Sequence, residues 1–381
     1  MEFVVNKREL VKGLGRVAGV ADRKSAMPML SNVLMEAEPM SGGVRLSATD
    51  LLLSVSSTVR AEVRKAGSVA LSARHLFDSV KALPEGEVTV SVAQNFSTRI
   101  KGSKRRFDLV GMAGEDFPQL PDPGRTPLSQ VPVDDLAELI AMTSFSMSTD
   151  DTRPHLSAAL FEMQRDILRI VTTDGHRLSK AERAVQGLGA SGASKLLIPA
   201  KGIHELKRLL DDLRAEKTAG GGAPLTIGVG AASSQGPVFF AREGVLLSSK
   251  LVDSAFPSYE QVIPTGTDRV ARLSRLTLLD SLRAVSTVAS DRSSGVKLAM
   301  SNNQVVVSSD NPDVGHAQDE IDAELTGKEL TIGFNSKYLI DVLSALTTND
   351  VQLELSGELD PGMVRPVERN DFIGVIMPMR I

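Results

Sequence analysis

The chain has 381 residues and a formal net charge of −4 at pH 7, so the molecule as a whole should not adhere to nucleic acid through bulk charge. Cysteine is absent, which excludes disulfides and thiol catalysis, and no apolar run reaches the ~18 residues that a membrane span needs. The N-terminus lacks the order of regions found in a secretory signal. We therefore expect a soluble cytoplasmic protein without a cofactor.

The first third of the chain begins with a predicted strand over residues 2–5 and a helix over residues 7–20. Apolar residues at helical spacing give this helix one apolar face, and its other face is basic. Several strands, a helix over residues 71–83 and more strands follow. Residues 115–127 are rich in Pro, Gly and Asp, which is typical of a linker.

The rest of the chain repeats this order twice. A helix over residues 133–147 and another over 198–210 alternate with strands, and then helices are predicted over residues 276–289 and 334–346. Strands outnumber helices and most connections have hairpin length, so the sheets should be largely antiparallel, with both helices of each unit on one side.

Two landmarks recur at matching offsets. The helix at Leu71–Leu83 returns at Ile198–Leu210 and at Phe334–Leu346. A strand end also recurs, as Thr49-Asp50, Thr173-Asp174 and Asp310-Asn311. A repeat of this length predicts three similar globular units. We expect an α+β fold of three pseudo-repeated domains over residues 1–122, 129–254 and 263–381.

Two short strings carry possible chemistry. Gly13, Gly15 and Ala18 match a dinucleotide-binding loop weakly, but helical periodicity starts before the glycines, which favours ordinary helix residues. Asp174 and His176 could form a catalytic pair. A hairpin turn or a binding surface is the more common meaning of Asp-Gly between two strands.

The C-terminus places two methionines around a proline at the end of an apolar strand, Val375 to Met379. Such a segment could be a core edge strand. Alternatively, flexible thioethers could line an adaptable groove for partner peptides. The sequence alone leaves both alternatives open.

Basic residues gather on helices at equivalent places of the repeat, on a protein whose net charge is negative. They are Lys7, Arg8, Lys12 and Arg16 on the first helix, and Lys201, Lys207 and Arg208 on the second copy of the recurring helix. If all helices face one way and acids lie elsewhere, repeated units could close into a ring with a positive hole. Such a hole would accept duplex DNA through sequence-independent phosphate contacts.

The whole chain resembles the bacterial sliding clamp family, the β subunit of DNA polymerase III. The resemblance rests on Leu30 to Leu34 after Pro28, Phe117-Pro118, Thr173 to Leu178, Phe256-Pro257 with Tyr259, Gly333-Phe334-Asn335 with Tyr338, and Met377 to Arg380.

This resemblance implies a head-to-tail homodimeric ring around duplex DNA that has no enzymatic activity and acts as a processivity factor. It also implies a groove between the second and third domains for linear motifs of polymerases, the clamp loader and repair proteins. Matching motif positions place the groove at Leu156, Thr173, Gly175, His176, Arg177, Leu178, Pro257, Val262, Tyr338, Val375, Met377, Pro378 and Met379. They place DNA contacts at Lys24, Arg74, Arg153, His155 and Lys201, and the subunit interface at Phe107 and Val288.

Three positions depart from parts of the family. Gln261 stands where some members have Arg at the rim of the groove, and Pro154-His155 replaces an aromatic pair that some members direct at DNA. Two other classes remain as alternatives. One is a hydrolase that uses Asp174 and His176, and the other is a monomeric peptide-binding scaffold that does not bind DNA.

Overall fold

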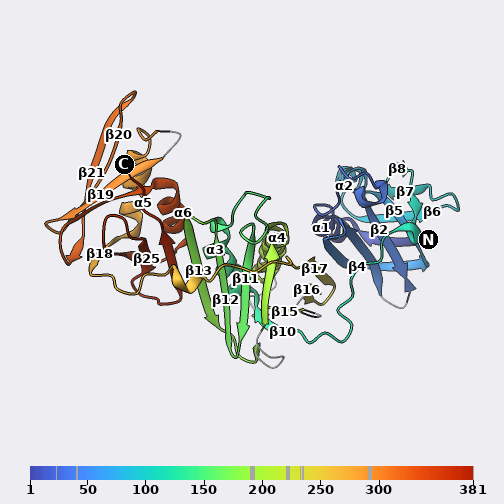
Figure 1. Cartoon of the computed structure of the whole chain (residues 1–381). Helices are drawn as coiled ribbons and strands as arrows, with labels where there is room; N and C mark the ends of the chain where they lie inside the picture. The colour runs from blue at the N-terminus through green and yellow to red at the C-terminus, as the bar shows by residue number, and fades with distance from the viewer. Residues whose placement is uncertain are drawn as a thin grey trace. The chain divides into compact units, whose positions relative to one another are not determined.

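Six α-helices and a series of antiparallel strands make up the described part of the computed structural model, which covers residues 1–22, 24–39, 42–188, 194–219, 224–231, 233, 236–290 and 294–380 (Figure 1). The helices are α1 (Lys7–Val17), α2 (Ala73–Ala82), α3 (Val133–Thr143), α4 (Ala200–Ala219), α5 (Arg275–Val285) and α6 (Ser336–Ala345). Short 3-10 helices span Pro28–Ser31, Gly114–Asp116, Ser144–Ser146 and Tyr259–Gln261.

Every predicted helix is present, but four differ from the prediction by three or more residues at the C-terminal end. Helix α3 ends at Thr143 rather than at residue 147, and α5 ends at Val285 rather than at residue 289. Helix α1 ends at Val17 rather than at residue 20, and α4 continues to Ala219. Asn6 caps α1, because its side chain accepts a hydrogen bond of 2.9 Å from the backbone N–H of Arg8. Gly13 lies inside this helix, where an added Cβ would come within 2.4 Å of Val59 Cγ1. The glycine therefore serves close packing of the helix on a strand rather than a dinucleotide loop.

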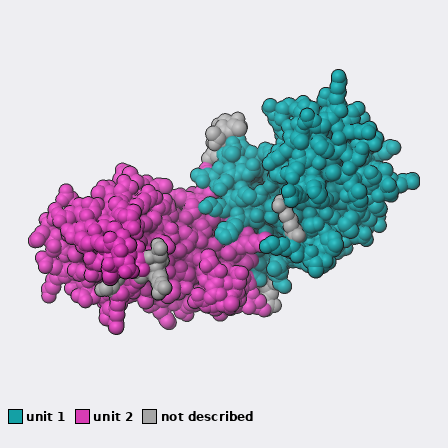
Figure 2. Space-filling view, turned by 90° about the horizontal axis from the view of Figure 1, so that it is seen from above, with its two compact units in different colours: residues 1–133, 204–251 teal, residues 134–203, 252–381 magenta. Residues whose placement is uncertain are grey.

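The chain divides into two compact units, residues 1–133 with 204–251 and residues 134–203 with 252–381 (Figure 2). The division cuts the middle third of the chain because hydrogen-bonded ladders join consecutive repeats. Strand β17 (Val245–Lys250) pairs with β4 (Leu53–Lys65) in the first unit, and β26 (Phe372–Ile376) pairs with β13 (Arg177–Ala184) in the second. The predicted boundaries at residues 122, 129, 254 and 263 stay predictions.

The first unit holds one large sheet with strand order β10-β15-β16-β17-β4-β1-β6-β7-β8, from which β2, β3, β5 and β9 continue. Besides β4 and β17, its strands are β1 (Glu2–Asn6), β2 (Asn32–Glu38), β3 (Gly43–Thr49), β5 (Gly67–Ser72), β6 (Glu87–Val92), β7 (Thr98–Gly102), β8 (Arg105–Leu109), β9 (Met112–Ala113), β10 (Ser129–Pro132), β15 (Thr226–Ala231) and β16 (Pro237–Arg242).

The second unit holds two sheets, with strand orders β14-β11-β12-β13-β26-β25-β24-β18-β22 and β21-β20-β19-β23. Their remaining strands are β11 (Ala158–Gln164), β12 (Ile167–Thr173), β14 (Ser194–Pro199), β18 (Arg269–Ser274), β19 (Gly295–Ser301), β20 (Gln304–Asn311), β21 (Gly315–Asp322), β22 (Glu324–Thr326), β23 (Leu330–Asn335), β24 (Asp350–Leu355) and β25 (Gly362–Pro366).

The threefold repeat appears as matching strand registers. Strands β5, β14 and β23 each lead directly into a copy of the recurring helix, and they pair with β2, β11 and β19. All strand pairs in the described residues are antiparallel, as predicted, and helices pack in pairs, α1 on α2 and α5 on α6. The matching registers show that three equivalent modules build the chain.

Among the described helices, none combines the length and the apolar character that a membrane span requires.

Candidate functional site

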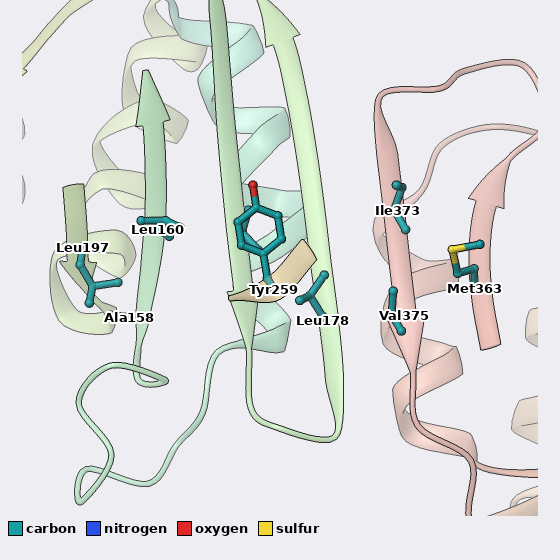
Figure 3. Packing of buried hydrophobic residues seen from close by; sticks show 9 residues of the cluster. Ala158, Leu160, Leu178, Leu197, Tyr259, Met363, Ile373 and Val375 are labelled. Atoms are coloured by element: carbon teal, nitrogen blue, oxygen red, sulfur yellow. The ribbon is translucent and has the colours of Figure 1, made fainter. Parts of the chain in front are cut away.

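An apolar cluster lies on the face of the second unit's large sheet that is opposite its helices, at the place where β13 meets β26. Figure 3 shows side chains from β11, β13, β14, β25 and β26 around Tyr259. Strand alternation explains the set, because Ala158 and Leu160 share one face of β11, and Leu178 is the direct partner of Val375. The cluster consists of Ala158, Leu160, Val171, Leu178, Leu197, Tyr259, Met363, Ile373 and Val375, with Val252, Phe256 and Ile263 against it.

The turn between β12 and β13 borders this cluster and is held by its own side chains. Thr173 Oγ1 accepts a hydrogen bond from Gly175 N at 3.1 Å and donates one to the Arg177 carbonyl at 2.6 Å. The Asp174 carboxylate accepts from the backbone N–H of His176 at 2.9 Å and of Arg177 at 3.1 Å. Gly175 has φ of +92°, which favours glycine. The predicted hairpin is confirmed, and Gly175 and His176 are exposed at its tip.

Arg177 joins this turn to two helical segments. Its guanidinium donates to Asp174 Oδ2 at 3.0 Å, to the Asp341 carboxylate on α6, and to the Phe145 carbonyl at 2.6 Å. The same group lies over the Tyr338 ring, with Cζ 4.5 Å from the ring centroid. The side chain is only 11% exposed. Arg177 is therefore a structural crosslink as much as a surface residue.

The last residues of the chain run along the edge of the cluster. Met377 N donates to the His176 carbonyl at 2.9 Å, and Met379 N donates to the Gly333 carbonyl at 2.9 Å. Val375 is buried, whereas Met377 is 40% exposed. Because β26 lies between β13 and β25, the edge-strand alternative is wrong. The C-terminal methionines instead border an apolar surface.

The connecting segment before β18 forms the opposite border. Tyr259 is 3% exposed, and its ring meets Phe256 edge-on with centroids 6.4 Å apart. Pro257 and Val262, on either side of Tyr259, are exposed. The cluster thus has an apolar floor, with the C-terminal methionines along one border and Pro257 and Val262 along the other. This arrangement suits the binding of an apolar linear peptide segment.

A row of alternating charges crosses the same sheet face next to the apolar floor. Lys195, Glu162, Arg169 and Glu182 are direct cross-strand neighbours on β14, β11, β12 and β13. The Tyr259 hydroxyl donates to Glu162 Oε2 at 2.7 Å, and Arg169 Nη1 donates to the Tyr259 hydroxyl at 3.3 Å. Lys195 Nζ lies 2.7 Å from Glu162 Oε1. Tyr259 therefore spans the apolar floor and the charged row.

The row sets the pKa values of its members. Burial acts to raise the pKa of Glu162, but hydrogen bonds from Lys195, Tyr259 and Arg169 outweigh burial and hold this pKa below its usual value. Burial, followed by the hydrogen bond to Glu162, raises the pKa of the Tyr259 phenol. Glu162 is consequently an anion although its side chain is 3% exposed.

All thirteen predicted groove residues belong to the second unit. Leu178 and Val375 lie in the floor, Thr173, Gly175, His176 and Arg177 form the turn, and Tyr338 lies under Arg177. Leu156 is buried beside Ser148, whose N–H donates to its carbonyl at 2.9 Å. Their roles stay predictions. Sequence reasoning missed Glu162, Arg169, Lys195 and Met363, although a charged residue at an inward position of the run Ala158–Gln164 could have indicated the row.

The basic face expected on the first helix is largely neutralised in the first unit. Lys7 and Arg8 pair with Glu85 at 3.1 and 2.9 Å. Lys12 Nζ lies 2.7 Å from Glu216, and Arg16 Nε lies 2.6 Å from Asp212. The expectation that acids lie elsewhere is wrong, because α4 continues for nine residues beyond the predicted end and carries Asp212 and Glu216 to these cations.

The predicted DNA-contact residues lie on exposed segments. In the first unit, Lys24 and Arg74 are exposed, and Arg74 lies 3.7 Å from Asp78. In the second unit, Arg153 pairs with Asp150 at 2.9 Å, and His155 is half-buried.

Two further predicted positions can be placed. Ala200 N donates to the Ser157 carbonyl at 3.0 Å, which sets exposed Lys201 beside the loop that carries His155. Phe107 on β8 and Val288 after α5 are half-buried. The binding roles of these residues stay predictions.

The catalytic alternative finds no support at Asp174. Both carboxylate oxygens accept hydrogen bonds that hold the turn, and the His176 side chain has no hydrogen bond among the described residues. Within the same residues, no group of three His, Cys, Asp or Glu side chains could hold a metal ion.

Three antiparallel modules with two helices each, joined by strand ladders, define the DNA clamp class of fold. Solved structures agree. A DNA polymerase sliding clamp from Bacillus subtilis matches with a TM-score of 0.92 and 26% identity, covering 100% of this chain and 99% of that one. A sliding clamp from Bartonella birtlesii bound to griselimycin matches with a TM-score of 0.90 and 33% identity, covering 100% of both chains.

Sequence comparison gives the family. Models of the N-terminal, central and C-terminal domains of the DNA polymerase III beta subunit match residues 1–121, 130–258 and 260–380. The beta sliding clamp of Pseudomonas aeruginosa is 32% identical over 383 residues, covering 100% of both chains. The chain belongs to the DNA polymerase III beta subunit family, the bacterial sliding clamps.

Proposed function

We propose that two copies of this chain close head to tail into a ring around duplex DNA and tether the replicative polymerase to it. In this proposal the protein is a cytoplasmic processivity factor without catalytic activity or cofactor, and its domains span residues 1–122, 129–254 and 263–381. Family membership along the whole chain is the observation that carries the proposal.

Two exposed sheet edges support a head-to-tail interface. Within the chain, the last strand of each later module pairs with a strand of the preceding module, and that strand is the one that follows the recurring turn. Strand β17 pairs with β4 in this way, and β26 pairs with β13. The corresponding strand of the third module is β21, and the corresponding last strand of the first module is β8. Each of these two strands ends the order of its sheet. We infer that β8 of one copy pairs with β21 of the other.

The internal joints also supply the register of this inferred pairing. Leu247 pairs with Val55, and Gly374 pairs with Ser179. The equivalent residues, counted along the matched ladders, are Phe107 on β8 and Ala317 on β21. The same register sets two basic residues of the loop and strand at 104–105 opposite two acidic residues of β21. The opposed pairs are Lys104 with Glu320 and Arg105 with Asp319.

The apolar cluster beside the Thr173–Leu178 turn is the proposed docking groove for linear motifs of polymerases, the clamp loader and repair proteins. Apolar anchors of a motif would rest on Leu178 and Val375, and the exposed methionine at 377 would adapt to different motifs. Pro378 and Met379, both half-buried, continue this border.

DNA contacts are proposed at Lys24, Arg74, Arg153, His155 and Lys201, directed at phosphates and independent of sequence. The exposed side chains at Lys24, Arg74, Arg153 and Lys201 support this assignment. Because a closed ring holds DNA topologically, weak contacts suffice.

A retention assay tests the ring. The protein is loaded onto nicked circular DNA by a clamp loader, and the fraction that remains bound is measured before and after the circle is linearised. We expect retention on circles and rapid loss from free ends. Equal retention on both forms would contradict the proposal, and so would a native mass of one chain.

A peptide-binding measurement tests the groove. Met377→Ala combined with Met379→Ala should weaken binding of a polymerase C-terminal peptide by about tenfold, because two apolar contacts are lost. Met27→Ala is the matched control, since Met27 is 48% exposed and lies in the first unit. Isothermal titration gives the affinities, and native mass checks that the dimer persists. Unchanged affinity in the double variant would remove the groove assignment.

A further inference from the structure

The first module carries a counterpart of the charged row under Tyr259. Glu36 on β2 is the direct cross-strand partner of Arg45 on β3, as Glu162 on β11 is of Arg169 on β12. The ladders match residue for residue, because Asn32 and Ala158 are the partners of Ser72 and Pro199, the residues directly before the recurring helix. Glu36 and Arg45 thus occupy the positions of Glu162 and Arg169.

The segment that covers this row differs at one decisive position. In the first module, Phe117-Pro118 leads to Leu120, whereas in the second module Phe256-Pro257 leads to Tyr259. Phe117 and Leu120 pack on an apolar cluster that includes Leu34, the equivalent of Leu160. Leu120 is the equivalent of Tyr259, and its side chain is apolar but provides no hydroxyl group.

An open cleft occupies the position where the tyrosine hydroxyl lies in the second module. Its volume is about 370 Å³. Glu36, Arg45 and Thr58 form one wall, and Pro123 and Leu246 line another part. Thr58 corresponds to Glu182, the Arg169 partner in the second module. Among the described residues, neither Glu36 nor Arg45 has an ion-pair partner, although in the second module their equivalents are fully engaged.

We propose that this cleft binds the phenol group of a tyrosine side chain from a partner polypeptide. A phenol is both a donor and an acceptor, so its O–H would donate to the Glu36 carboxylate while its oxygen accepts from the Arg45 guanidinium. This is the pattern that Tyr259 makes with Glu162 and Arg169 at 2.7 and 3.3 Å. The flat ring would rest on Pro123 and Leu246, and the cleft volume exceeds that of a phenol ring.

The charge balance of the cleft favours a neutral phenol over a phosphorylated one. Glu36 and Glu38 both line the cleft, together with Arg45 and Arg242. Arg242 Nη1 already donates to the Thr226 carbonyl at 3.0 Å. Two carboxylates beside the binding position would repel an added phosphate. The site lies wholly within the first unit and does not depend on the groove near Tyr259.

The test compares two probes that differ by one oxygen atom, N-acetyl-tyrosinamide and N-acetyl-phenylalaninamide, on the full-length protein. Ligand-observed NMR titration gives both dissociation constants. We expect the tyrosine probe to bind with a Kd on the order of 1 mM, and the phenylalanine probe to bind roughly tenfold more weakly. Arg45→Met should remove this preference. Arg45 is exposed, so the variant should fold.

A second variant closes the cleft from within the chain. Leu120→Tyr places the hydroxyl over Glu36 and Arg45, so it should raise the thermal midpoint of the protein and abolish probe binding. Leu120→Met is the matched control, because it retains an apolar side chain without a hydroxyl and should bind the probe like the original chain. Equal affinities for the two probes would overturn the proposal, as would unchanged binding in Arg45→Met.

Discussion

Tyr259 shows how one side chain ties an irregular segment to a sheet. Its ring belongs to the apolar cluster, and its hydroxyl donates to Glu162 in the charged row. The segment around it has little regular structure of its own, so few other hydrogen bonds hold it. The position of Pro257 and Val262 therefore depends on this tyrosine.

The first prediction removes the hydroxyl alone. Tyr259→Phe should lower the free energy of unfolding by about 1.5 kcal/mol, the size of one hydrogen bond to a charged group. Denaturant unfolding measures the change. Tyr338→Phe is the matched control, since its ring keeps the contact with Arg177 and its hydroxyl has no hydrogen bond among the described residues. A larger loss in the control than in Tyr259→Phe would contradict the argument.

The second prediction concerns pH. The protein has no tryptophan and two tyrosines, so Tyr338→Phe leaves Tyr259 as the sole phenol. Because burial and Glu162 raise its pKa, the phenol should stay neutral through the range near about 10 where free tyrosine ionises. Absorbance at the tyrosinate band follows the titration. Ionisation of Tyr259 in the folded protein at the pKa of free tyrosine would refute the prediction.

The sign of the linked stability change follows from the direction of each pKa shift. Because the pKa of Tyr259 is raised in the folded protein, its contribution to the free energy of unfolding is fully present below the pKa of the unfolded chain. This contribution is lost as pH rises through the pKa of the folded protein. The pKa of Glu162 is lowered, so its contribution to the free energy of unfolding is lost at low pH, as pH falls through the pKa of this carboxyl group in the folded protein. Stability of the second unit should therefore decline at both extremes.

Single residues were the least predictable level from sequence. The Thr-Asp-Gly turn was readable because its chemistry is local, and Asp174 makes the expected backbone contacts. Glu162, Arg169 and Lys195 come from three different strands, and their meeting depends on register, which sequence periodicity does not give.

At the scale of elements, the same turn recurs with different surroundings. The Leu52 carbonyl accepts from Lys250 N at 2.8 Å, as the His176 carbonyl accepts from Met377 N at 2.9 Å. Beside the first turn, however, the paired floor positions hold Ser54 and Ser248, whereas beside the second they hold Leu178 and Val375. Equivalent backbones thus produce an apolar floor at the second turn and a polar one at the first.

The third prediction addresses the crosslink between this turn and α6. Arg177→Lys should lower the affinity for a polymerase peptide by about tenfold, because lysine cannot hold two carboxylates, a carbonyl and an aromatic face at once. Arg283→Lys is the control, since Arg283 is 56% exposed at a distant position on α5. Isothermal titration measures both variants, and equal affinities would show that the crosslink does not shape the groove.

Helix and strand positions followed well from periodicity, and their ends did not. The repeat correctly placed a helix after β5, β14 and β23. The predicted end of α4 was wrong because the helix continues past residue 210 and carries Asp212 and Glu216 to cations of α1, a tertiary contact outside any local pattern.

At the scale of the whole molecule, two strands that each end the order of their sheet pair on one side only among the described residues. The third module's β21 carries Asp319 and Glu320, and the first module's β8 begins with Arg105 and follows Lys104. Exposed strand edges pair readily with other chains. A second copy with complementary charge is the partner that we propose for these edges.

The fourth prediction reverses these charges. Lys104→Glu with Arg105→Glu should raise the dimer dissociation constant by roughly 10- to 100-fold, because like charges would then face each other across the inferred ladder. Sedimentation analysis measures the constant. Arg60→Glu is the control, since Arg60 is exposed on β4, away from the edge.

A compensating change makes the same test specific. Adding Asp319→Lys and Glu320→Lys to the reversed chain should restore the dimer, because every pair regains opposite signs. A reversed chain that dimerises as before, or one that the second pair of changes fails to rescue, would refute the register.

The carboxylates that meet the cations of α1 have a consequence for motion along DNA. A basic group that is already paired with Glu85, Asp212 or Glu216 neutralises DNA phosphates less and therefore releases fewer counterions from the duplex. If α1 lines the hole of the proposed ring, it should offer little friction, and the rate of diffusion along a duplex should change only slightly with ionic strength.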